Sequence, residues 1–479
     1  MPLYQDIANE LRDSIRNQTF KAGDKLPSLR KLAKQLEVSI ATVLEAYHQL
    51  EAQGLVATKP QSGYYVVHRQ RLLAVPPSSK NLQPAMLHLG EAINDIRANA
   101  QQTDNFDFGL AIPHSDLLPN QLLSQLAKQA LKQTSTAMGG ALLSPGYEPL
   151  RQQIAQLMLS RGCTIHPDQI LITNGCQEAL LLALQTTTKA GDIVAVESPC
   201  YHGFLLALES LNLQVVTIAS HSEQGMDLDA LETAAKNWPI KACIISPTIS
   251  NPCGTTMGAE AKKRLVELGE KYKITLIEDD IFGELHFNAN RPKPLMAFSS
   301  NNNRRQTNNT VIYCSSFSKT VAPGLRVGWI LSHSLQHQFI ERQMATTTGA
   351  NSFAQHILSK YLQAGHHQKQ LQQLRLLYQQ NQQKAMALIA SHFPPNTKAT
   401  QPDGGFILWL SLDKKINTYK LYQLALAEKI SIIPGQLFAR SGFTNCLRIN
   451  YARPWTPTAS KKLARLGELA HKLLAQANP

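Results

Sequence analysis

The sequence of 479 residues lacks the features that mark several protein classes. It has no apolar run long enough to span a bilayer and no signal peptide at its start, so we expect neither a membrane protein nor a secreted one. Its seven cysteines are scattered without CxxC pairs, and their odd number argues against a disulfide framework. The expected compartment is therefore the reducing cytoplasm.

Two common nucleotide-binding motifs are also missing. Neither the phosphate loop GxxxxGK[ST] nor the dinucleotide motif GxGxxG is present, which argues against ATP and NAD as ligands. Acidic side chains are in the minority, with 34 Asp and Glu against 47 Lys and Arg, and the net charge of +13 is compatible with a polyanionic partner such as DNA. The length predicts two or three domains, and a hydrophobic content of 43% is enough for sizeable cores.

The most informative stretch of the chain is residues 315–329, which follow a predicted buried strand. Lys319 stands there among small polar and apolar residues, with no acidic residue close in the sequence. This setting suits an amine that must be neutral part of the time in order to attack a carbonyl. Pro323 and Gly324 predict a turn, after which Arg326 offers a fork of donors suited to a phosphate. A single lysine in such a turn is, however, more often an ordinary surface residue.

The stretch as a whole resembles the cofactor-lysine segment of the fold-type I aminotransferases, which use pyridoxal 5'-phosphate (PLP). The residues that carry the resemblance are Ser316, Ser318, Lys319, Pro323, Gly324, Arg326, Gly328 and Trp329. The resemblance implies that Lys319 bonds covalently to PLP and that Ser316 and Arg326 hold the cofactor phosphate, with Ser318 also in the cofactor site.

The sequence around this stretch predicts a large domain, residues 106–354, with an α/β fold and a mostly parallel sheet. Apolar runs alternate there with helical patterns such as residues 177–188. The expected buried strands are residues 170–173, 193–196, 243–245, 274–277 and 311–313. Ligands of such sheets lie at the C-terminal ends of the strands, and polar motifs follow several of these strands directly.

Three of these motifs resemble further parts of the aminotransferase site. A turn that leads into a helix resembles the phosphate cup, although alone it is an ordinary strand–helix connection. Tyr201 matches the aromatic ring that stacks on the pyridine, and Asn251 of an NPxG-like element matches the donor to the phenolic oxygen of the cofactor. The resemblance implies that the phosphate meets Gly175, Cys176 and Gln177.

A pair of adjacent acids, Asp279 and Asp280, follows another predicted strand. By resemblance Asp279 pairs with the pyridine nitrogen, which keeps the ring an electron sink, and it joins Lys319 in the catalytic set. Asp280 is the neighbour that could be mistaken for it. Phe282 stands where the family often has a tyrosine, and residues 141–142 (Ala-Leu) replace the tyrosine that many homodimeric aminotransferases lend to their partner. Both departures weigh against efficient transamination but leave PLP binding intact.

Residues 355–479 predict a bridging helix and a small C-terminal α+β domain. The bridge is the Gln-rich stretch 368–389, and strands are expected at residues 404–410 and 430–435. The adjacent His366 and His367 lack a second ligand set for a metal. By resemblance Arg448 is the bidentate clamp for a substrate or effector carboxylate, together with Asn251, which implies recognition of an amino acid or amine.

Residues 1–68 predict three short helices followed by a β-hairpin. Ile7, Leu11 and Ile15 recur at helical spacing, while Ser28 and Ser39 can cap the second and third helices. This order is that of a helix-turn-helix with a wing, in which the third helix reads DNA. A small helical bundle with a hairpin is also a common structural module.

The motifs at residues 26–33, 38–43, 46–51 and 54–56 resemble the GntR-type winged helix-turn-helix. The resemblance implies that double-stranded DNA is contacted by Ser28, Arg30, Ser39, Thr42, Lys59 and Gly63. Ile40 departs from the pattern, because the family usually has a basic residue there. This departure leaves the affinity for an operator and its sequence open.

The remaining residues, 69–105, contain Pro76, Pro77, Ser78 and Ser79 and predict a linker, within which residues 86–96 could form a short helix. A GntR-type reader followed by an aminotransferase-like domain resembles the MocR subfamily of transcription regulators. We therefore expect a homodimer whose PLP site, loaded with PLP or with PLP and an amine, biases the two DNA readers. Two alternatives stay open: an active aminotransferase with a regulatory DNA-binding module, and a PLP-binding protein that has lost DNA binding.

Overall fold

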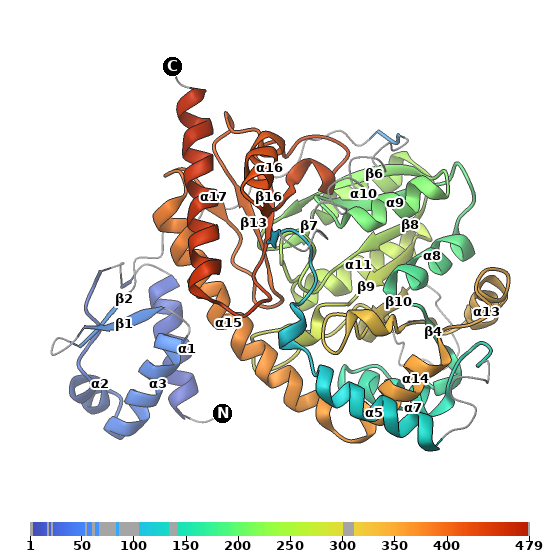
Figure 1. Ribbon diagram of the computed structural model, residues 1–479, viewed down its shortest axis with the longest axis horizontal. Helices are drawn as coiled ribbons and strands as arrows, with labels where there is room; N and C mark the ends of the chain where they lie inside the picture. Colours follow the sequence, from blue (N-terminus) through green and yellow to red (C-terminus); the bar gives the residue numbers. More distant parts are fainter. Residues whose placement is uncertain are drawn as a thin grey trace.

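A computed structural model describes residues 3–16, 19–20, 23–52, 55–59, 63–66, 83–85, 105–133, 142–299 and 311–477. A small N-terminal unit precedes a much larger part that contains an eight-stranded and a four-stranded sheet (Figure 1). Within the described ranges, no helix is both long and apolar enough to cross a membrane. The helix expected at 86–96 and the Pro-Ser stretch at 76–79 lie outside the described residues.

The N-terminal unit has the three helices and the hairpin that the sequence predicts. Its elements are α1 (Leu3–Arg16), α2 (Leu29–Gln35), α3 (Ile40–Ala52), β1 (Val56–Lys59) and β2 (Gly63–Val66). Ile7 and Leu11 of α1 pack against Val43 and Leu50 of α3 in one buried cluster. The hairpin strands pair antiparallel with Lys59 opposite Gly63, and the turn at residues 60–62 lies outside the described residues.

Both predicted caps are present. Ser28 Oγ accepts a hydrogen bond from the backbone N–H of Lys31 at 3.3 Å, and Ser39 Oγ accepts one from the N–H of Thr42 at 3.1 Å. The Tyr47 hydroxyl of α3 donates to the carbonyl of Pro27 at 2.7 Å. This bond ties the third helix to the start of the second, so the two capped helix ends keep a fixed relation to each other.

The large sheet has the order β4-β11-β10-β9-β8-β5-β6-β7. Its strands are β4 (Ile170–Thr173), β5 (Ile193–Ser198), β6 (Gln214–His221), β7 (Gly225–Met226), β8 (Ile240–Ile245), β9 (Thr275–Asp279), β10 (Val311–Ser316) and β11 (Gly328–Leu331). Six strands run in one direction, and only β11 and β7 pair antiparallel with their neighbours. The expected mostly parallel sheet is confirmed, although β6, β7 and β11 lie outside the predicted strands.

Both faces of this sheet are buried, which explains the continuous apolar runs. Successive residues of β5 alternate between the two faces: Ile193 and Ala195 join one core cluster, whereas Val194 and Val196 join another. Figure 1 shows the helices arranged around the sheet. They are α5 (Asn120–Gln133), α7 (Glu148–Ser160), α8 (Cys176–Thr187), α9 (His202–Ser210), α10 (Leu228–Asn237), α11 (Ala259–Tyr272), α12 (Met296–Ser299), α13 (Gln336–Met344) and α14 (Ser352–Gln363).

The C-terminal part begins with the long helix α15 (His366–His392), which contains the Gln-rich stretch 368–389 and confirms that it is helical. A four-stranded sheet of order β12-β13-β16-β15 follows. Its elements and their neighbours are β12 (Lys398–Ala399), β13 (Ile407–Ser411), α16 (Thr418–Ala427), β14 (Ile430–Ser431), β15 (Ile433–Pro434), η5 (Gly435–Phe438), β16 (Cys446–Asn450) and α17 (Pro457–Gln476).

The strand expected at 430–435 is split in two, because its two parts pair with different partners. β14 pairs with β3 (Phe106–Asp107), directly after the predicted linker, whereas β15 pairs with β16. Short 3₁₀ helices complete the fold: η1 (Ser115–Leu117), η2 (Pro167–Gln169), η3 (Gly283–Leu285) and η4 (Pro323–Leu325).

Candidate functional site

The residues predicted to bind the cofactor come together where the parallel strands of the large sheet end. β9 ends at Asp279, and β10 ends at Ser316, three residues before Lys319. Gly175 follows β4, and Tyr201 follows β5. This is the sheet edge at which α/β proteins bind ligands.

Lys319 is a partly buried amine whose pKa is low for a lysine. Its Nζ donates to the carbonyl of Ala111 at 2.6 Å. Burial, and after it the positive charge of Arg448, lower the pKa of Lys319 to about 8, while Asp279 opposes the shift. A large share of Lys319 is therefore neutral near pH 8, as carbonyl chemistry requires. The Ala111 carbonyl has no motif that would have revealed it in the sequence.

Asp279 is buried at the end of β9 and also has a shifted pKa. Burial raises the pKa of Asp279 to about 7, while a hydrogen bond from Cys176 Sγ, at 3.4 Å from its Oδ1, favours the ionised form. Lys319 contributes a further favourable charge. A carboxyl poised in this way would ionise fully once a positively charged ring nitrogen lay beside it.

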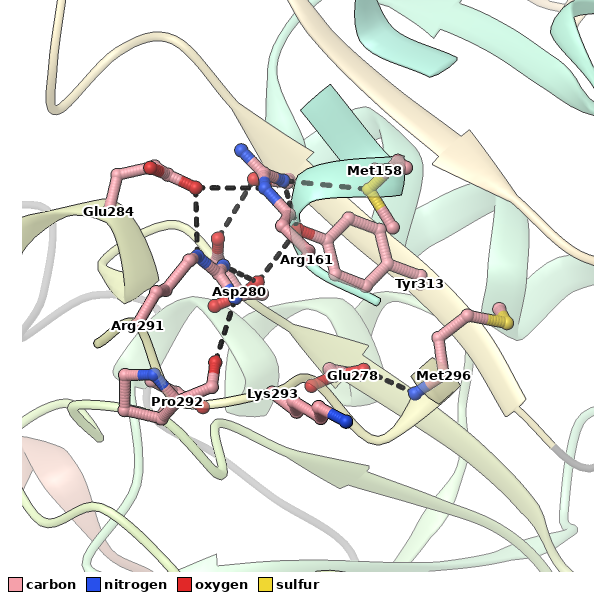
Figure 2. A network of polar contacts seen from close by, with 12 residues as sticks. Met158, Arg161, Glu278, Asp280, Glu284, Arg291, Pro292, Lys293, Met296 and Tyr313 are labelled. Atoms are coloured by element: carbon pink, nitrogen blue, oxygen red, sulfur yellow. Dashed lines mark hydrogen bonds and ion pairs between the residues drawn. The ribbon is translucent and has the colours of Figure 1, made fainter. Parts of the chain in front are cut away.

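Asp280 belongs to a different environment on the opposite face of the sheet. Its Oδ2 accepts a hydrogen bond from the Tyr313 hydroxyl at 2.7 Å and forms an ion pair with Arg291. Figure 2 shows this network, in which Arg161 donates to the Tyr313 hydroxyl at 2.6 Å and also pairs with Glu284. Arg291 Nε lies 2.8 Å from the same Glu284 carboxylate. Asp280 is thus bound into a buried ionic network and is not available to a ligand beside Lys319.

The start of α8 and the side chain of Arg326 form one end of the site. Gly175 has φ +89°, and a Cβ there would lie 2.6 Å from Arg326 Nη2, so both the backbone and the guanidinium require glycine. Arg326 is exposed and donates to the carbonyl of Asn174 at 3.1 Å. The helix then begins at Cys176, which leaves the first backbone N–H groups, including that of Gln177, free to bind an anion.

Two serine hydroxyls at the end of β10 complete this end. Ser316 Oγ accepts the backbone N–H of Ser318 at 3.4 Å. Ser318 Oγ is buried and has no hydrogen-bond partner among the described residues, a state that buried hydroxyls rarely keep. An unsatisfied hydroxyl, a helix start and a guanidinium are donors for a phosphate. The residues present therefore fit the phosphate of PLP.

Tyr201 lies just before α9, with its ring against His202 and Phe204. Gly203 makes room for it, because a Cβ on Gly203 would come within 2.3 Å of the Tyr201 ring. The side chain of Gln177 donates to the carbonyl of Gly203 at 2.9 Å and so connects α8 to α9. The Tyr201 ring is thus held in place by its contacts with His202, Gly203 and Phe204.

Arg448 of β16 is almost completely buried, with 1% of its surface exposed. Its Nη1 donates to Asn251 Oδ1 at 2.7 Å, and its Nη2 donates to the carbonyl of Gly109 at 2.6 Å. Burial lowers the pKa of Arg448 to about 10, and its Nε has no hydrogen-bond partner among the described residues. The structure thus joins Arg448 and Asn251, as the sequence predicts, and adds the Gly109 carbonyl, which no motif indicated.

Of the two departures at the site, the one at Phe282 lies fully within the described residues. Phe282 is buried, and the Nζ of Lys319 lies 5.9 Å from the centre of its ring. Phe282 therefore lies near Lys319 but has no hydroxyl that could donate a hydrogen bond. Ala141 lies outside the described residues, and the backbone N–H of Leu142 donates to Ser352 Oγ at 3.0 Å.

The residues predicted to bind DNA lie mostly at the N-terminal ends of α2 and α3. Ser28, Arg30 and Ser39 are exposed, and Thr42 is partly exposed with its hydroxyl 2.8 Å from that of Ser39. Gly63 is exposed at the start of β2, opposite Lys59, whose side chain lies outside the described residues. Ile40 has 48% of its surface exposed at the first residue of α3.

Glu51 is a residue of this unit to which the sequence assigned no role. Its carboxylate Oε1 accepts hydrogen bonds from the backbone N–H of Thr58 at 3.1 Å and from its hydroxyl at 3.0 Å. The end of α3 is thereby bonded to the first strand of the hairpin. A carboxylate seven residues before its partner gives no recognisable pattern, so only the folded arrangement reveals this link.

Comparison with known proteins agrees with this geometry in both parts of the chain. Residues 3–66 match the model of the bacterial regulatory proteins of the gntR family, and residues 109–465 match that of the class I and II aminotransferases. The chain belongs to the MocR type of GntR-family regulators. Two relatives from Escherichia coli K12 are the uncharacterized HTH-type transcriptional regulators YjiR, 33% identical, and YdcR, 35% identical; each match covers 99% of this chain and 100% of the relative.

A solved structure supports the fold of the larger part. The α-aminoadipate aminotransferase LysN from Thermus thermophilus, complexed with N-(5'-phosphopyridoxyl)-L-leucine, superposes with a TM-score of 0.73 at 27% identity. The match covers 81% of this MocR-type chain and all of LysN. The predicted fold class, a winged helix-turn-helix followed by a fold-type I aminotransferase domain, is confirmed.

Proposed function

We propose that this MocR-type protein is a cytoplasmic transcription regulator that binds an operator through its N-terminal unit and senses PLP, or an amino compound together with PLP, in its aminotransferase-like domain. The observation that carries the proposal is the presence of both sites in one chain. A capped helix-turn-helix with a wing accompanies a sheet edge where a lysine with a lowered pKa, a buried aspartate and a phosphate-type cradle come together.

On the DNA side, the hydroxyls and backbone groups at the starts of α2 and α3 would grip phosphates. Ser28 and Ser39 already accept backbone hydrogen bonds, so the Ser28 hydroxyl can donate to a phosphate, and so can one hydroxyl of the hydrogen-bonded pair Ser39 and Thr42. Arg30 would add a charge-assisted contact, while Thr42 faces the groove from the reading helix. Lys59 and Gly63 would bring the wing to the adjacent backbone.

On the cofactor side, each residue has a separate task. Lys319 would bond to the aldehyde of PLP, and Asp279 would pair with the pyridine nitrogen. The phosphate would be held by Gly175, Cys176, Gln177, Ser316, Ser318 and Arg326, while Tyr201 would stack on the ring and Asn251 would bond to its phenolic oxygen. When bound, PLP supplies an aldehyde and an electron-withdrawing ring. The residues of the chain would fix the position of PLP and place charged groups beside it.

Arg448 is the proposed contact for an effector carboxylate. Its planar fork suits bidentate binding, and its buried Nε has an unused donor among the described residues. Its Nη1 and Nη2 each donate one hydrogen bond, to Asn251 and to the Gly109 carbonyl, and each Nη has a second N–H beside that of Nε with which to bind a carboxylate. An amine that carries a carboxylate would therefore gain a contact that a simple amine lacks.

We also propose that the regulator is a homodimer assembled through the large domains. Leu143 and Met344 are apolar residues with 60% and 55% of their surfaces exposed. They lie on segments that contact each other, because the N–H of Leu142 bonds to Ser352 and a Cβ on Gly349 would meet the Leu142 carbonyl at 2.7 Å. Light scattering of Leu143→Glu against the parent chain tests this surface: a monomer is expected, and an unchanged dimer would exclude it.

A second candidate function, amino-acid transamination, is favoured by the intact set of Lys319, Asp279, Asn251 and Arg448. Relatives that are aminotransferases by name include the 2-aminoadipate transaminase of Thermus thermophilus, 28% identical over 80% of this chain and 94% of the relative. Phe282 weighs against it, because a hydroxyl near Lys319 is missing. Steady-state assays with a panel of amino acids separate the two: robust multiple turnover would support the enzyme, and a single slow turnover would support the sensor.

The decisive experiment is footprinting of the DNA upstream of the gene with and without PLP. A stable probe for the loaded site is N-(5'-phosphopyridoxyl)-L-leucine, which carries both the phosphate and a carboxylate. We expect the footprint or the operator affinity to change when PLP or this adduct is added. In Arg448→Ala the response to the adduct should weaken while PLP binding remains; a regulator whose footprint ignores both ligands would contradict the proposal.

A further inference from the structure

The free edge of the large sheet is covered at β6 by a piece of the linker. β7 pairs with β6 only at Ser220 and His221, so the N-terminal half of β6 has an edge open to another strand. Ala85 occupies it: its N–H donates to the Val215 carbonyl at 3.3 Å, and its carbonyl accepts from the Val215 N–H at 3.0 Å. In Figure 1 this short piece lies beside β6. Two backbone hydrogen bonds are a weak attachment, which a small change nearby can release.

Arg440 reinforces this attachment from the C-terminal part of the chain. Its Nη1 donates to the Gln83 carbonyl at 3.0 Å and lies 3.5 Å from the carbonyl of Val215. One guanidinium thus binds the linker and the sheet edge at the same time. Arg440 follows η5 closely in the chain, so docking of the linker depends on where the η5 segment lies.

The η5 segment also contacts the proposed effector site. The ring of Phe438, two residues before Arg440, packs against the guanidinium of Arg448 at 4.9 Å. The carbonyl of Phe438 accepts the backbone N–H of Cys200 at 2.7 Å, directly before Tyr201. The segment is therefore in contact with both the carboxylate clamp and the element that carries the stacking ring.

A ligand carboxylate would change these contacts at their source. A carboxylate bound by two parallel hydrogen bonds would use the unpartnered Nε of Arg448 and one Nη, and would draw the guanidinium away from the position that Asn251 and the Gly109 carbonyl now give it. If the Arg448 guanidinium turns toward a ligand, it loses its present packing on the Phe438 ring. Because Arg440 is only two residues from Phe438, a shift of Phe438 also moves Arg440. Arg440 donates to the Gln83 and Val215 carbonyls at 3.0 and 3.5 Å, and the longer of these distances is close to the upper limit for a hydrogen bond. A movement of η5 away from these carbonyls would therefore break both bonds.

We propose that Arg440 couples the effector site to the linker: a carboxylate bound by Arg448 shifts the η5 segment and releases residues Gln83 to Ala85 from β6. The linker thereby exists in a docked and a released state, and the ligand acts by its different affinity for the two. This inference rests on the proposed function and specifies its regulation. The released linker gives the DNA-binding unit a different range of positions relative to the large domain.

Amide hydrogen exchange on the full-length protein, loaded in separate samples with PLP or with the adduct N-(5'-phosphopyridoxyl)-L-leucine in its place, tests the docking step. In the parent chain we expect faster exchange at Ala85 and Val215 in the adduct-loaded sample than in the PLP-loaded one. In Arg440→Ala these amides should already exchange fast and no longer respond. Lys420→Ala, which removes one exposed cation of α16 and so the same charge, should behave as the parent. Parent-like protection in Arg440→Ala, or slower exchange with the adduct, would overturn the proposal.

Operator binding tests the coupling separately. In the parent we expect the adduct to change operator affinity by about fivefold or more, the lower range of allosteric coupling. In Arg440→Ala this ratio should fall to near one, while the absorbance of lysine-bound PLP stays as in the parent. A full response in Arg440→Ala would overturn the role of Arg440. If the parent itself shows no response, the proposed function fails, whereas the exchange experiment still decides whether Arg440 holds the linker.

Discussion

Asp279 and Asp280 are consecutive residues whose carboxylates serve opposite faces of the large sheet. Asp279 bonds to Cys176 and lies near Lys319, whereas Asp280 bonds to Tyr313 and pairs with Arg291. Cys176 and Tyr313 belong to two different core clusters, one on each face. The alternation of side chains at the strand end thus places Asp279 beside Lys319 and Asp280 in the buried ionic network.

Exchanging each acid for its amide should separate these roles. Asp279→Asn should keep the fold but weaken PLP binding roughly ten- to hundredfold, since a hydrogen bond to a charged group contributes about 1.5–3 kcal/mol. Asp280→Asn should leave PLP affinity nearly unchanged and destabilise the protein by about 3 kcal/mol, because it breaks a buried ion pair. PLP titration by absorbance and denaturant unfolding measure the two effects. The opposite pattern would mean that Asp280 is the cofactor acid.

The rate at which PLP bonds to the protein should depend on pH through Lys319. Only the neutral amine reacts, and burial lowers the pKa of Lys319 to about 8. The capture rate should therefore rise about tenfold per pH unit below pH 8 and level off above it. Arg448→Ala removes a positive neighbour and should move the midpoint to higher pH. Stopped-flow absorbance measures the rate, with Lys319→Ala giving no lysine-bound signal; a rate that does not change across pH 8 would contradict the assignment.

Much of this site could be predicted from the sequence, because its parts follow strand ends. Each predicted strand is a continuous apolar run, because both faces of a parallel sheet are buried. Gly175, Asp279 and Lys319 follow such runs within a few residues. The topology then brings those ends together. The cap at Ser28 could also be predicted, because a hydroxyl directly before a helix accepts a hydrogen bond from a backbone N–H of the first turn.

What the sequence could not show are contacts between residues far apart in the chain that follow no repeat. Glu284 meets Arg161 across more than a hundred residues, and no local pattern marks either as buried. Backbone carbonyls such as that of Gly109 carry no side-chain signature at all. The docking of Ala85 escaped prediction for the same reason, because an edge strand of one residue has no period to recognise.

Arg30 should contribute to operator binding mainly through charge. It is exposed at the first turn of α2, beside the capped end. Arg30→Ala should weaken binding to all DNA sequences and reduce the steepness of the salt dependence by about one phosphate contact. Lys34→Ala, in the last turn of the same helix, is the matched control and should change affinity much less. Gel-shift titrations at several salt concentrations decide; equal losses in the two variants would indicate a diffuse field rather than a contact.

Ile40 is the residue at which this protein should differ most from relatives with a basic residue there. It is exposed at the N-terminal end of the reading helix, next to the Ser39 cap, where a cation could reach a phosphate. Ile40→Arg should therefore tighten DNA binding and steepen its salt dependence by about one further phosphate contact, because one more counterion is released. Ile40→Leu keeps the apolar surface and should leave the salt slope unchanged. If Ile40→Arg instead weakens operator binding with an unaltered slope, the isoleucine faces a base rather than the backbone, where an apolar side chain suits a thymine methyl group.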